Sequence, residues 1–320
     1  MTNQTFDQFP ENMWVTAVPV ATVWTSPQSP RDVDEPGVRP HADIDQWIRD
    51  LSHEESLALC EENRIQSQVL YGEPVIMIDK KETFAKVIIP SQPSKKDERG
   101  YPGWIPCAQL MQVNKTNWMS NQFAVVTQKK AFLEDKQGEN VMKLSYMTML
   151  PIASSRQTRI EVKTPHGKGY LSKEAVHMFP SEKGIEQGSG QDIVRAGEPF
   201  VQLAYFWGGM SSFGYDCSGL AYATHKANGY RIARDASDQA SSGEKVDLEE
   251  LLPGDLVFFA YEEGKGKLHH VGIYYGNGKM LHAPQTGKGV EIVALKGTIY
   301  ERELCAARRY WRRREGSNDE

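Results

Sequence analysis

Cys217 is the cysteine of this chain whose neighbours suit a nucleophile. It follows a glycine- and aromatic-rich run, Tyr205-Phe-Trp-Gly-Gly-Met-Ser-Ser-Phe-Gly-Tyr215, and precedes helix-forming residues that continue to Asn228-Gly229. This order predicts a helix that starts at or just after Cys217 and stops at the Asn-Gly pair. At a helix start, unpaired N–H groups and the positive end of the dipole favour a thiolate over a thiol. We therefore expect an attacking group at Cys217.

A cysteine nucleophile needs a base and a group that orients the base, and two histidines suit these roles. In the predicted strand His269-His-Val-Gly-Ile-Tyr-Tyr275, alternate side chains share a face. His270 then lies on the open face beside Gly272, while His269 lies on the apolar face and is structural. The Gly276-Asn-Gly278 turn predicts a hairpin that brings His282 within cross-strand reach of His270. We expect Cys217, His270 and His282 to act as nucleophile, base and orienter.

Two other interpretations of the same residues are weaker. A lone cysteine on a helix is more often a small buried hydrophobe, but the glycine loop and the two histidines argue against that here. Cys217, His270 and His282 are also chemically able to bind zinc, although no fourth ligand stands at a suitable short spacing. The sequence holds no GxxxxGK[ST] motif for a nucleotide. We expect no metal and no cofactor.

The elements around these residues predict an α+β domain over residues 191–314. A helix from Asp192 to Leu203 comes first, then the glycine loop and the cysteine helix, and five strands follow. Helices followed by an antiparallel sheet are typical of the α+β class. Residues 183–190 are glycine-rich and form a linker.

The first 182 residues predict two small all-β domains, at 13–118 and 119–182. Short β-rich pieces alternate with turns, and Trp14 to Trp24 is expected to be one strand. A strand with a glycine, an aromatic residue and a short apolar tail recurs as Gly103-Trp-Ile-Pro and Gly169-Tyr-Leu-Ser. This repeated pattern of short strands and turns resembles two successive bacterial SH3-like barrels. A helical insertion at about 42–70, with Ser52 and Glu55 as a capping box, interrupts the first barrel.

Composition narrows the cellular setting and the partners. The 320 residues are 39% hydrophobic and 25% charged, with a net charge of −5, which argues against a nucleic-acid surface. No apolar run is long enough to cross a bilayer, and the first residues lack the pattern of a secretory signal. Four scattered cysteines without a CxxC motif fit a reducing compartment. We expect a cytoplasmic protein that does not contact membrane; its oligomeric state is left open.

The motifs of the last domain resemble those of the NlpC-type cell-wall cysteine peptidases, which have a papain-like fold. They occur in the family's order over about residues 190–311: Trp-Gly-Gly, Asp216-Cys217-Ser218-Gly219, Pro253-Gly-Asp-Leu-Val-Phe-Phe259, His270-Val-Gly-Ile-Tyr274 and Leu281-His282-Ala283. The resemblance implies a catalytic triad of Cys217, His270 and His282. It also places Asp216 and Ser218 beside the nucleophile and Tyr205 near the oxyanion site. Tyr205 and Trp207 have an alternative role as core aromatics.

Two barrels in front, the insertion in the first barrel and the missing signal resemble one subgroup, the YkfC-like γ-D-glutamyl-L-diamino-acid endopeptidases. That resemblance implies hydrolysis of peptidoglycan stem peptides with a free N-terminal L-Ala, as in murein peptide recycling, with lysine or diaminopimelate as the diamino acid. It also implies that acidic and tyrosine groups bind the ammonium. Asp235 in Arg234-Asp-Ala-Ser-Asp-Gln239 matches one of them, and Tyr101 and Glu73 match in the first barrel. Glu73 has an alternative role as a solvated strand end.

Two other functions stay open at the level of sequence. One is a non-catalytic wall-binding or scaffold protein, against which the intact triad argues. The other is an amidase or acyltransferase of the same papain-like fold. If the protein is a peptidase, we expect the two barrels to restrict its substrates to small peptides.

Overall fold

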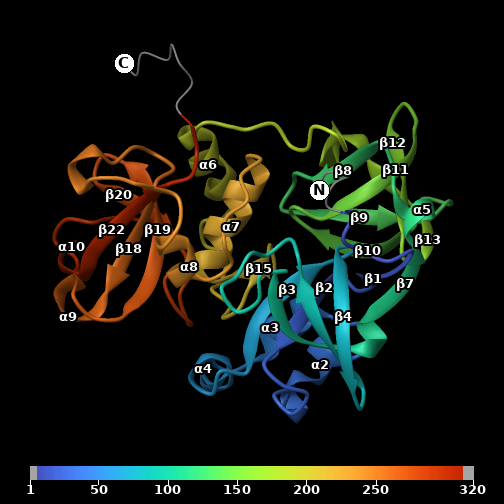
Figure 1. Cartoon of the computed structure of the whole chain (residues 1–320), viewed down its shortest axis with the longest axis horizontal. Helices are drawn as coiled ribbons and strands as arrows, with labels where there is room; N and C mark the ends of the chain where they lie inside the picture. The colour runs from blue at the N-terminus through green and yellow to red at the C-terminus, as the bar shows by residue number, and fades with distance from the viewer. Residues whose placement is uncertain (1–5, 313–320) are drawn as a thin grey trace. The chain divides into compact units, whose positions relative to one another are not determined.

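The structure is a computed structural model that describes residues 6–312 (Figure 1). The chain divides into two compact units. Unit 1 comprises the residues up to 91, 96–184 and 207–213, and unit 2 comprises 92–95, 185–206 and the residues from 214 onward. Among the described residues, no helix combines the length and the apolar character needed to cross a bilayer.

Unit 1 contains two seven-stranded antiparallel sheets with the same topology. The first is formed by β1 (Asn12–Thr16), β2 (Val20–Trp24), β3 (Ile65–Leu70), β4 (Pro74–Lys81), β5 (Phe84–Ile89), β6 (Tyr101–Pro106) and β7 (Leu110–Asn114). The second is formed by β8 (Gln122–Val126), β9 (Lys130–Glu134), β10 (Asn140–Ser145), β11 (Met149–Ser155), β12 (Arg159–Thr164), β13 (Gly167–Ser172) and β14 (Val176–Pro180). The orders, β3-β2-β6-β5-β4-β1-β7 and β10-β9-β13-β12-β11-β8-β14, correspond strand for strand.

The correspondence extends to the short helices and to one glycine in each sheet. Short 3-10 helices, η2 (Cys107–Gln109) and η3 (Lys173–Ala175), join the sixth strand to the seventh in both sheets, and α5 (Lys115–Trp118) lies between the sheets in the chain. A Cβ atom at Gly103 in β6 would lie 2.3 Å from Val23 of β2, and one at Gly169 in β13 would lie 2.7 Å from Leu133 of β9. Since no side chain fits at either crossing, the recurring glycine reflects one packing requirement used twice.

The helical insertion of the first sheet differs in its bounds from the prediction. It consists of η1 (Asp32–Asp34), α2 (Glu35–Val38), α3 (Ile44–Asp50) and α4 (His53–Glu61). The capping box at Ser52 and Glu55 is confirmed. The predicted bounds of about 42–70 are wrong, because the helices start earlier and 65–70 is strand β3, paired with β2. The polar residues there suggested a helix, but Gln68 is buried and its Oε1 accepts bonds from Met210 N and Ser211 Oγ, 3.0 Å each.

The single strand expected from Trp14 to Trp24 is also a wrong prediction. It is two strands, β1 and β2, which occupy different places in the sheet. The break falls between Thr16 and Val20, where Pro19 has no N–H to donate to a ladder. The Ala17 N–H donates instead to the Gln109 carbonyl over 2.8 Å.

Unit 2 has the expected order of helices first and an antiparallel sheet after. Its helices are α6 (Gly190–Gly197), η4 (Glu198–Phe200), α7 (Cys217–Ala227), α8 (Ala236–Ala240), η5 (Leu248–Glu250), α9 (Tyr261–Gly264) and α10 (Ile299–Glu303). Its strands are β16 (Gly214–Tyr215), β17 (Glu244–Lys245), β18 (Leu256–Ala260), β19 (Leu268–Gly276), β20 (Lys279–His282), β21 (Glu291–Ala294) and β22 (Leu304–Arg309), while β15 (Met210–Ser211) belongs to unit 1. The helix predicted from Asp192 to Leu203 is shorter, since α6 ends at Gly197 and a 3-10 turn follows.

The main sheet of unit 2 presents its strands in the order β17-β22-β18-β19-β20-β21, and α6 and α7 pack against β19 (Figure 1). Asn277 and Gly278 have φ of 52° and 68°, as the predicted hairpin turn between β19 and β20 requires. The last strand is held by Asp255, which accepts bonds from Arg309 Nε and Trp311 Nε1. Two all-β domains followed by an α+β domain confirm the predicted fold class.

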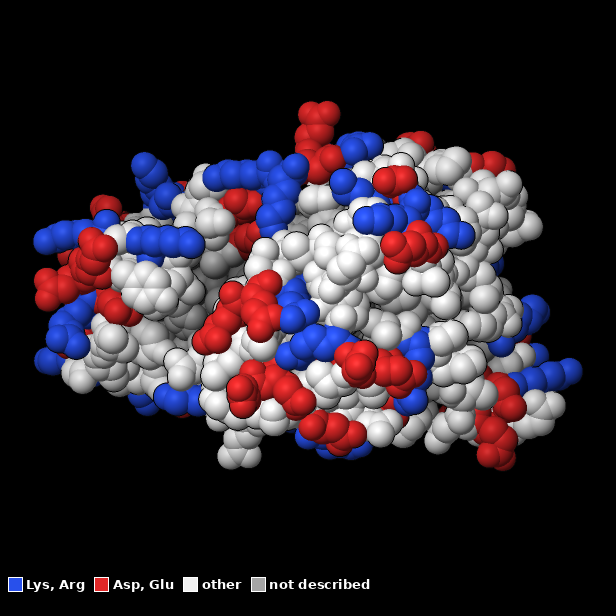
Figure 2. All heavy atoms as spheres, turned by 90° about the horizontal axis from the view of Figure 1, so that it is seen from below, with Lys and Arg blue, Asp and Glu red and all other residues white. Residues whose placement is uncertain are grey.

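Charged side chains on the face shown in Figure 2 are interspersed, with acidic and basic groups alternating over short distances. Two ion pairs lie within unit 1: Lys130 and Lys143 of the second sheet both bind the Asp45 carboxylate, at 2.9 and 3.0 Å. Because Asp45 lies in α3, these pairs tie the insertion of the first sheet to the second sheet within unit 1.

Candidate active site

The nucleophile candidate lies at the first residue of α7, as predicted. Asp216 is the N-cap, and its Oδ1 accepts the Gly219 N–H over 2.7 Å. The helix ends at Asn228, and Gly229 follows with φ of +71°, a conformation that favours glycine. Cys217 is partly buried, and a backbone hydrogen bond from Val271 reaches its thiol. The thiol therefore lies beside β19, next to the residue that follows His270.

The two histidines meet across the β19–β20 hairpin. His270 Nε2 lies 2.8 Å from His282 Nδ1, and the ring centroids are 5.0 Å apart at an interplanar angle of 75°. Both side chains are buried, His282 to 1% exposure and His270 to 4%. Since Nε2 of His270 is engaged with His282, Nδ1 is its nitrogen left for the thiol. The two facing nitrogens are directed at each other for a hydrogen bond. They are therefore not both directed at one zinc ion.

His269 lies where the β18–β19 register shifts, between the pairings of His270 and Leu268, so simple strand alternation does not describe its position. Its ring stacks on Tyr261 with centroids 4.1 Å apart, and its Nε2 lies 3.0 Å from Glu303 Oε2. These contacts give His269 a structural role and leave His270 as the base candidate.

Burial shifts the pKa values of the three groups toward their uncharged forms. Burial, reinforced by the Asp216 charge, raises the pKa of Cys217 to about 12. Burial and the neighbouring histidines hold the pKa of His270 well below its ordinary value, and burial with the Lys288 charge lowers the pKa of His282 to about 4. The expectation that the helix start favours a thiolate is therefore wrong for the substrate-free site. Desolvation disfavours the charged form, and the Asp216 carboxylate offsets the positive end of the helix.

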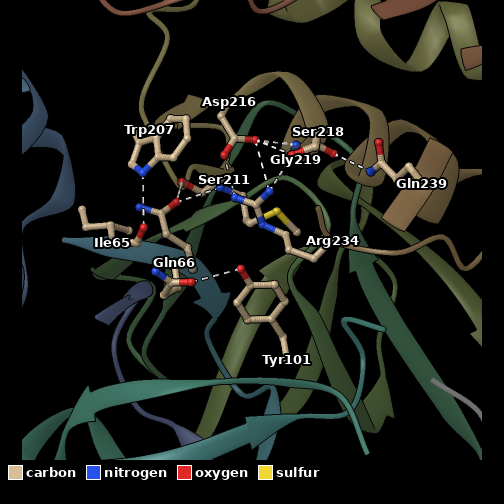
Figure 3. Close-up of polar contacts among 12 residues, drawn as sticks. Ile65, Gln66, Tyr101, Trp207, Ser211, Asp216, Ser218, Gly219, Arg234 and Gln239 are labelled. Carbon is tan, nitrogen blue, oxygen red and sulfur yellow. Dashed lines mark hydrogen bonds and ion pairs between the residues drawn. The ribbon is translucent and has the colours of Figure 1, made fainter. Parts of the chain in front are cut away.

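A buried ion pair between Arg234 and Asp216 stabilises the start of α7. Arg234 Nη2 lies 2.6 Å from Asp216 Oδ2, with side-chain exposures of 2% and 7%. Figure 3 shows the guanidinium directed at both Asp216 and Ser218, whose Oγ accepts from Arg234 Nη1 over 2.7 Å. Gln239 Nε2 donates to the Ser218 carbonyl over 3.1 Å. Asp216 and Ser218, predicted as substrate-binding residues, thus have internal partners that hold the helix in place.

The other two predicted residues of unit 2 are Asp235 and Tyr205. Asp235 follows Arg234 directly and is the N-cap of α8, partly buried. Tyr205 forms an isolated parallel bridge with Tyr215, and its backbone N–H donates to the Lys288 carbonyl over 2.9 Å. Their contacts with substrate stay predictions.

Three predicted residues lie in unit 1. Glu73 is buried, its Oε1 accepts the Ser91 hydroxyl and its Oε2 accepts the Leu70 N–H, so the alternative of a solvated strand end is wrong. Tyr101 is buried, and its hydroxyl contacts Lys96 Nζ and lies 3.4 Å from Gln66 Oε1. The Trp207 indole N–H donates to the Ile65 carbonyl over 3.2 Å (Figure 3). These bonds orient the three side chains, and their roles toward substrate stay predictions.

Sequence reasoning missed Arg234, Tyr300 and Glu291. Tyr300 in α10 packs against both histidines, with ring centroids 5.7 Å from His270 and 5.0 Å from His282. Glu291 Oε1 lies 3.4 Å from His282 Nε2. Tyr300 and Glu291 stand apart from every quoted motif, and only folding brings α10 and β21 to the histidines. The buried partner of Arg234 is equally invisible in the sequence.

Family models match two parts of this chain. One described as the NlpC/P60 family matches residues 202–309, which include the cysteine and both histidines, and one described as the YKFC SH3b2 domain matches 126–179. A gamma-D-glutamyl-L-lysine dipeptidyl-peptidase of Bacillus subtilis is 46% identical over 291 residues, which are 91% of this chain and 96% of that protein. The chain belongs to the NlpC/P60 family.

Further relatives agree with that membership. A gamma-D-glutamyl-L-lysine dipeptidyl-peptidase of Bacillus cereus is 37% identical, over 92% of this chain and 89% of that protein. The crystal structure of an NlpC/P60 family protein from Bacillus cereus has a TM-score of 0.90 and 35% identity, covering 93% of this chain and all of that one. The predicted resemblance and the enzyme class, a cysteine peptidase, are confirmed.

Proposed function

We propose that this NlpC/P60 protein hydrolyses the γ-D-glutamyl-L-diamino-acid bond of peptidoglycan-derived stem peptides that carry a free N-terminal L-Ala. The observation that carries the proposal is the 46% identity to a gamma-D-glutamyl-L-lysine dipeptidyl-peptidase, which spans the β-rich region as well as the peptidase domain. A relative matched over a shorter part of the chain, a murein DD-endopeptidase of Escherichia coli aligned over 42% of it, has a different name.

The chemistry follows from the neutral groups of the site. Nδ1 of His270 accepts the thiol proton as Cys217 Sγ attacks the γ-carbonyl carbon, so no stable thiolate is needed beforehand. The imidazolium then gives this proton to the leaving amine of the diamino acid, and a thioester to the γ-glutamyl carbonyl remains. Water, deprotonated by His270, attacks the thioester, and the returning proton restores the thiol. Throughout, His282 holds His270 through the 2.8 Å contact.

Asp235 is the group in unit 2 that we propose for the ammonium of L-Ala. It is partly buried at the start of α8 and directly follows the arginine that anchors the nucleophile helix. A carboxylate pairs well with an ammonium, and a blocked N-terminus forfeits that charge-assisted contact at a cost of about 1–3 kcal/mol. Glu73 and Tyr101 keep the same proposed role from the resemblance.

The test is a comparison of two peptides. L-Ala-γ-D-Glu-L-Lys with a free N-terminus is incubated with wild type and Cys217→Ala, beside the same peptide acetylated on L-Ala, and the products are identified by mass spectrometry. We expect L-Ala-D-Glu and lysine from the free peptide, at least tenfold slower cleavage of the acetylated one, and no product with Cys217→Ala. Equal cleavage of both peptides contradicts N-terminal recognition. Binding without cleavage, or transfer to an added amine, favours a scaffold protein or an acyltransferase.

We also propose that the enzyme works in the cytoplasm on imported fragments of wall peptides. A peptidase that depends on the Cys217 thiol suits a reducing compartment, and the chain's cysteines are scattered, without a CxxC pair. Fractionation of cells that express the native protein tests this. Recovery with the wall or the medium contradicts it.

A further inference from the structure

Glu291 lies beside His282, at the ring nitrogen that does not contact His270. The β20–β21 register places Glu291 opposite His282, and Glu291 Oε1 lies 3.4 Å from His282 Nε2. The His282 side chain is fully buried, whereas that of Glu291 is 41% exposed. His282 Nε2 has no hydrogen-bond partner among residues 6–312, and this carboxylate is a charged group close to it.

We propose that Glu291 is a positioning residue that selects the tautomers of both histidines and so leaves Nδ1 of His270 unprotonated to receive the Cys217 proton. The inference rests on the cysteine-peptidase chemistry proposed above. It assigns a function to a residue outside the Cys217–His270–His282 set.

Two neutral imidazoles can share one hydrogen bond in two ways, which differ in the ring that donates. Each neutral ring carries a single N–H, so the 2.8 Å contact between His270 Nε2 and His282 Nδ1 has one donor and one acceptor. If His282 donates from Nδ1, its Nε2 lone pair faces the Glu291 carboxylate, and the N–H of His270 lies on Nδ1. In that state His270 presents a donor to the thiol and is not able to take its proton.

The opposite assignment places each N–H toward an acceptor or a negative charge. An N–H on His282 Nε2 points at a carboxylate that only accepts, His282 Nδ1 accepts from His270 Nε2–H, and His270 Nδ1 keeps its lone pair. The 3.4 Å separation is longer than an ordinary hydrogen bond, so the carboxylate acts through its charge on the N–H dipole. Burial supports this neutral chain by lowering the pKa values of both histidines.

The other groups around the pair do not make this selection. Lys288 is a cation that lowers the pKa of His282, so it opposes protonation without accepting an N–H. The Tyr300 ring meets His282 edge to face at 87° and holds its plane. His269 lowers the pKa of His270 from the adjacent position in β19. Among the charged groups near His282, Glu291 is therefore the one whose negative charge favours an N–H on Nε2.

The experiment compares full-length Glu291→Leu, Glu291→Gln and the control Glu249→Leu, an exposed glutamate of η5 in the same unit. The ring nitrogens of His270 and His282 are read by 15N NMR, which separates the two tautomers without any substrate. The reaction of Cys217 with iodoacetamide gives a second readout, and turnover of a cleaved peptide, as kcat and KM, gives a third. Circular dichroism checks the fold of each variant.

In wild type we expect the proton of both histidines on Nε2. Glu291→Leu should shift His270 toward the Nδ1–H tautomer, slow alkylation of Cys217 about tenfold, and lower kcat about tenfold or more with little change in KM. Glu291→Gln keeps an acceptor oxygen and should recover part of the loss, while Glu249→Leu should match wild type.

Unchanged histidine tautomers and unchanged alkylation in a folded Glu291→Leu protein overturn the proposal. So does a wild-type His270 protonated on Nδ1. If the proposed γ-D-glutamyl substrate is not cleaved, the NMR and alkylation readouts still decide the role of Glu291, so the two failures are distinguishable.

Discussion

Arg234 and Asp216 form a buried ion pair whose nearest atoms, Nη2 and Oδ2, are 2.6 Å apart, and Asp216 is the residue directly before the nucleophile. The same carboxylate caps α7 through the Gly219 N–H, and the same guanidinium binds Ser218 Oγ. The residues on both sides of Cys217 are thus held by one arginine from outside the helix. This arrangement restricts the position of the thiol before any substrate arrives.

Removing the arginine should destabilise the protein strongly. Arg234→Gln leaves the Asp216 carboxylate buried without its counter-charge, so we expect the free energy of unfolding to fall by about 3–5 kcal/mol in urea denaturation. The exposed Arg302→Gln is the matched control, expected within about 0.5 kcal/mol of wild type. A loss in Arg234→Gln no larger than in the control contradicts a structural role for the pair.

Cys217→Ala should abolish hydrolysis while the protein stays folded. The substitution removes one sulfur atom from a helix start whose cap, Asp216, is unaffected, so the circular dichroism spectrum should match wild type. The exposed Cys305→Ala is the control and should keep full turnover. Undiminished peptide cleavage by Cys217→Ala would refute the assignment of the nucleophile.

The thiol of the substrate-free enzyme should remain protonated well above neutral pH. Burial and the Asp216 charge raise the pKa of Cys217 to about 12, so thiolate absorbance in the ultraviolet should not develop between about pH 7 and pH 9, where an exposed cysteine titrates. The difference spectrum of wild type minus Cys217→Ala isolates this residue. A Cys217 thiolate that forms near pH 8 contradicts the prediction.

Stability should fall in mild acid because buried histidines are held neutral. Burial lowers the pKa of His225 to about 4 in the folded state, so between about pH 6.5 and pH 4 only the unfolded chain binds the proton. His225 therefore contributes fully to the free energy of unfolding above about pH 6.5. This contribution, roughly 3 kcal/mol, is lost as the pH falls toward 4. His282, with a pKa of about 4, acts in the same direction.

Urea unfolding at several pH values from about 7 down to 4 measures this loss. In His225→Gln the side chain no longer titrates, so the decline in stability should be shallower than in wild type. An equally steep decline in both proteins attributes the acid sensitivity to other groups.

Local rules account for the parts of the site that the sequence predicted. The strand pattern singled out His270 in β19, and the Gly276-Asn-Gly278 turn placed His282 on the neighbouring strand. The Asn228-Gly229 pair correctly marked the end of the nucleophile helix. These inferences held because each depends on residues close in the chain, whose geometry the backbone determines almost alone.

Predictions that depended on distant partners were less accurate. Residues 65–70 seemed to belong to the insertion because their polar side chains suggested a helix, yet the segment is strand β3, in which Gln68 is satisfied by Met210 and Ser211. The thiolate expected at Cys217 was also wrong. A pKa depends on how deeply a group is buried, and burial is a property of the whole packed domain.

By itself, then, the sequence determined the fold class and predicted Cys217, His270 and His282 as the catalytic set, since these follow from motif order, helix punctuation and a two-residue strand period. Only the tertiary structure decided that Arg234 anchors Asp216, that Glu291 faces His282, and that the thiol and both imidazoles are neutral. The physical reason is that electrostatic interactions depend on distance and desolvation between groups that the chain brings together only on folding.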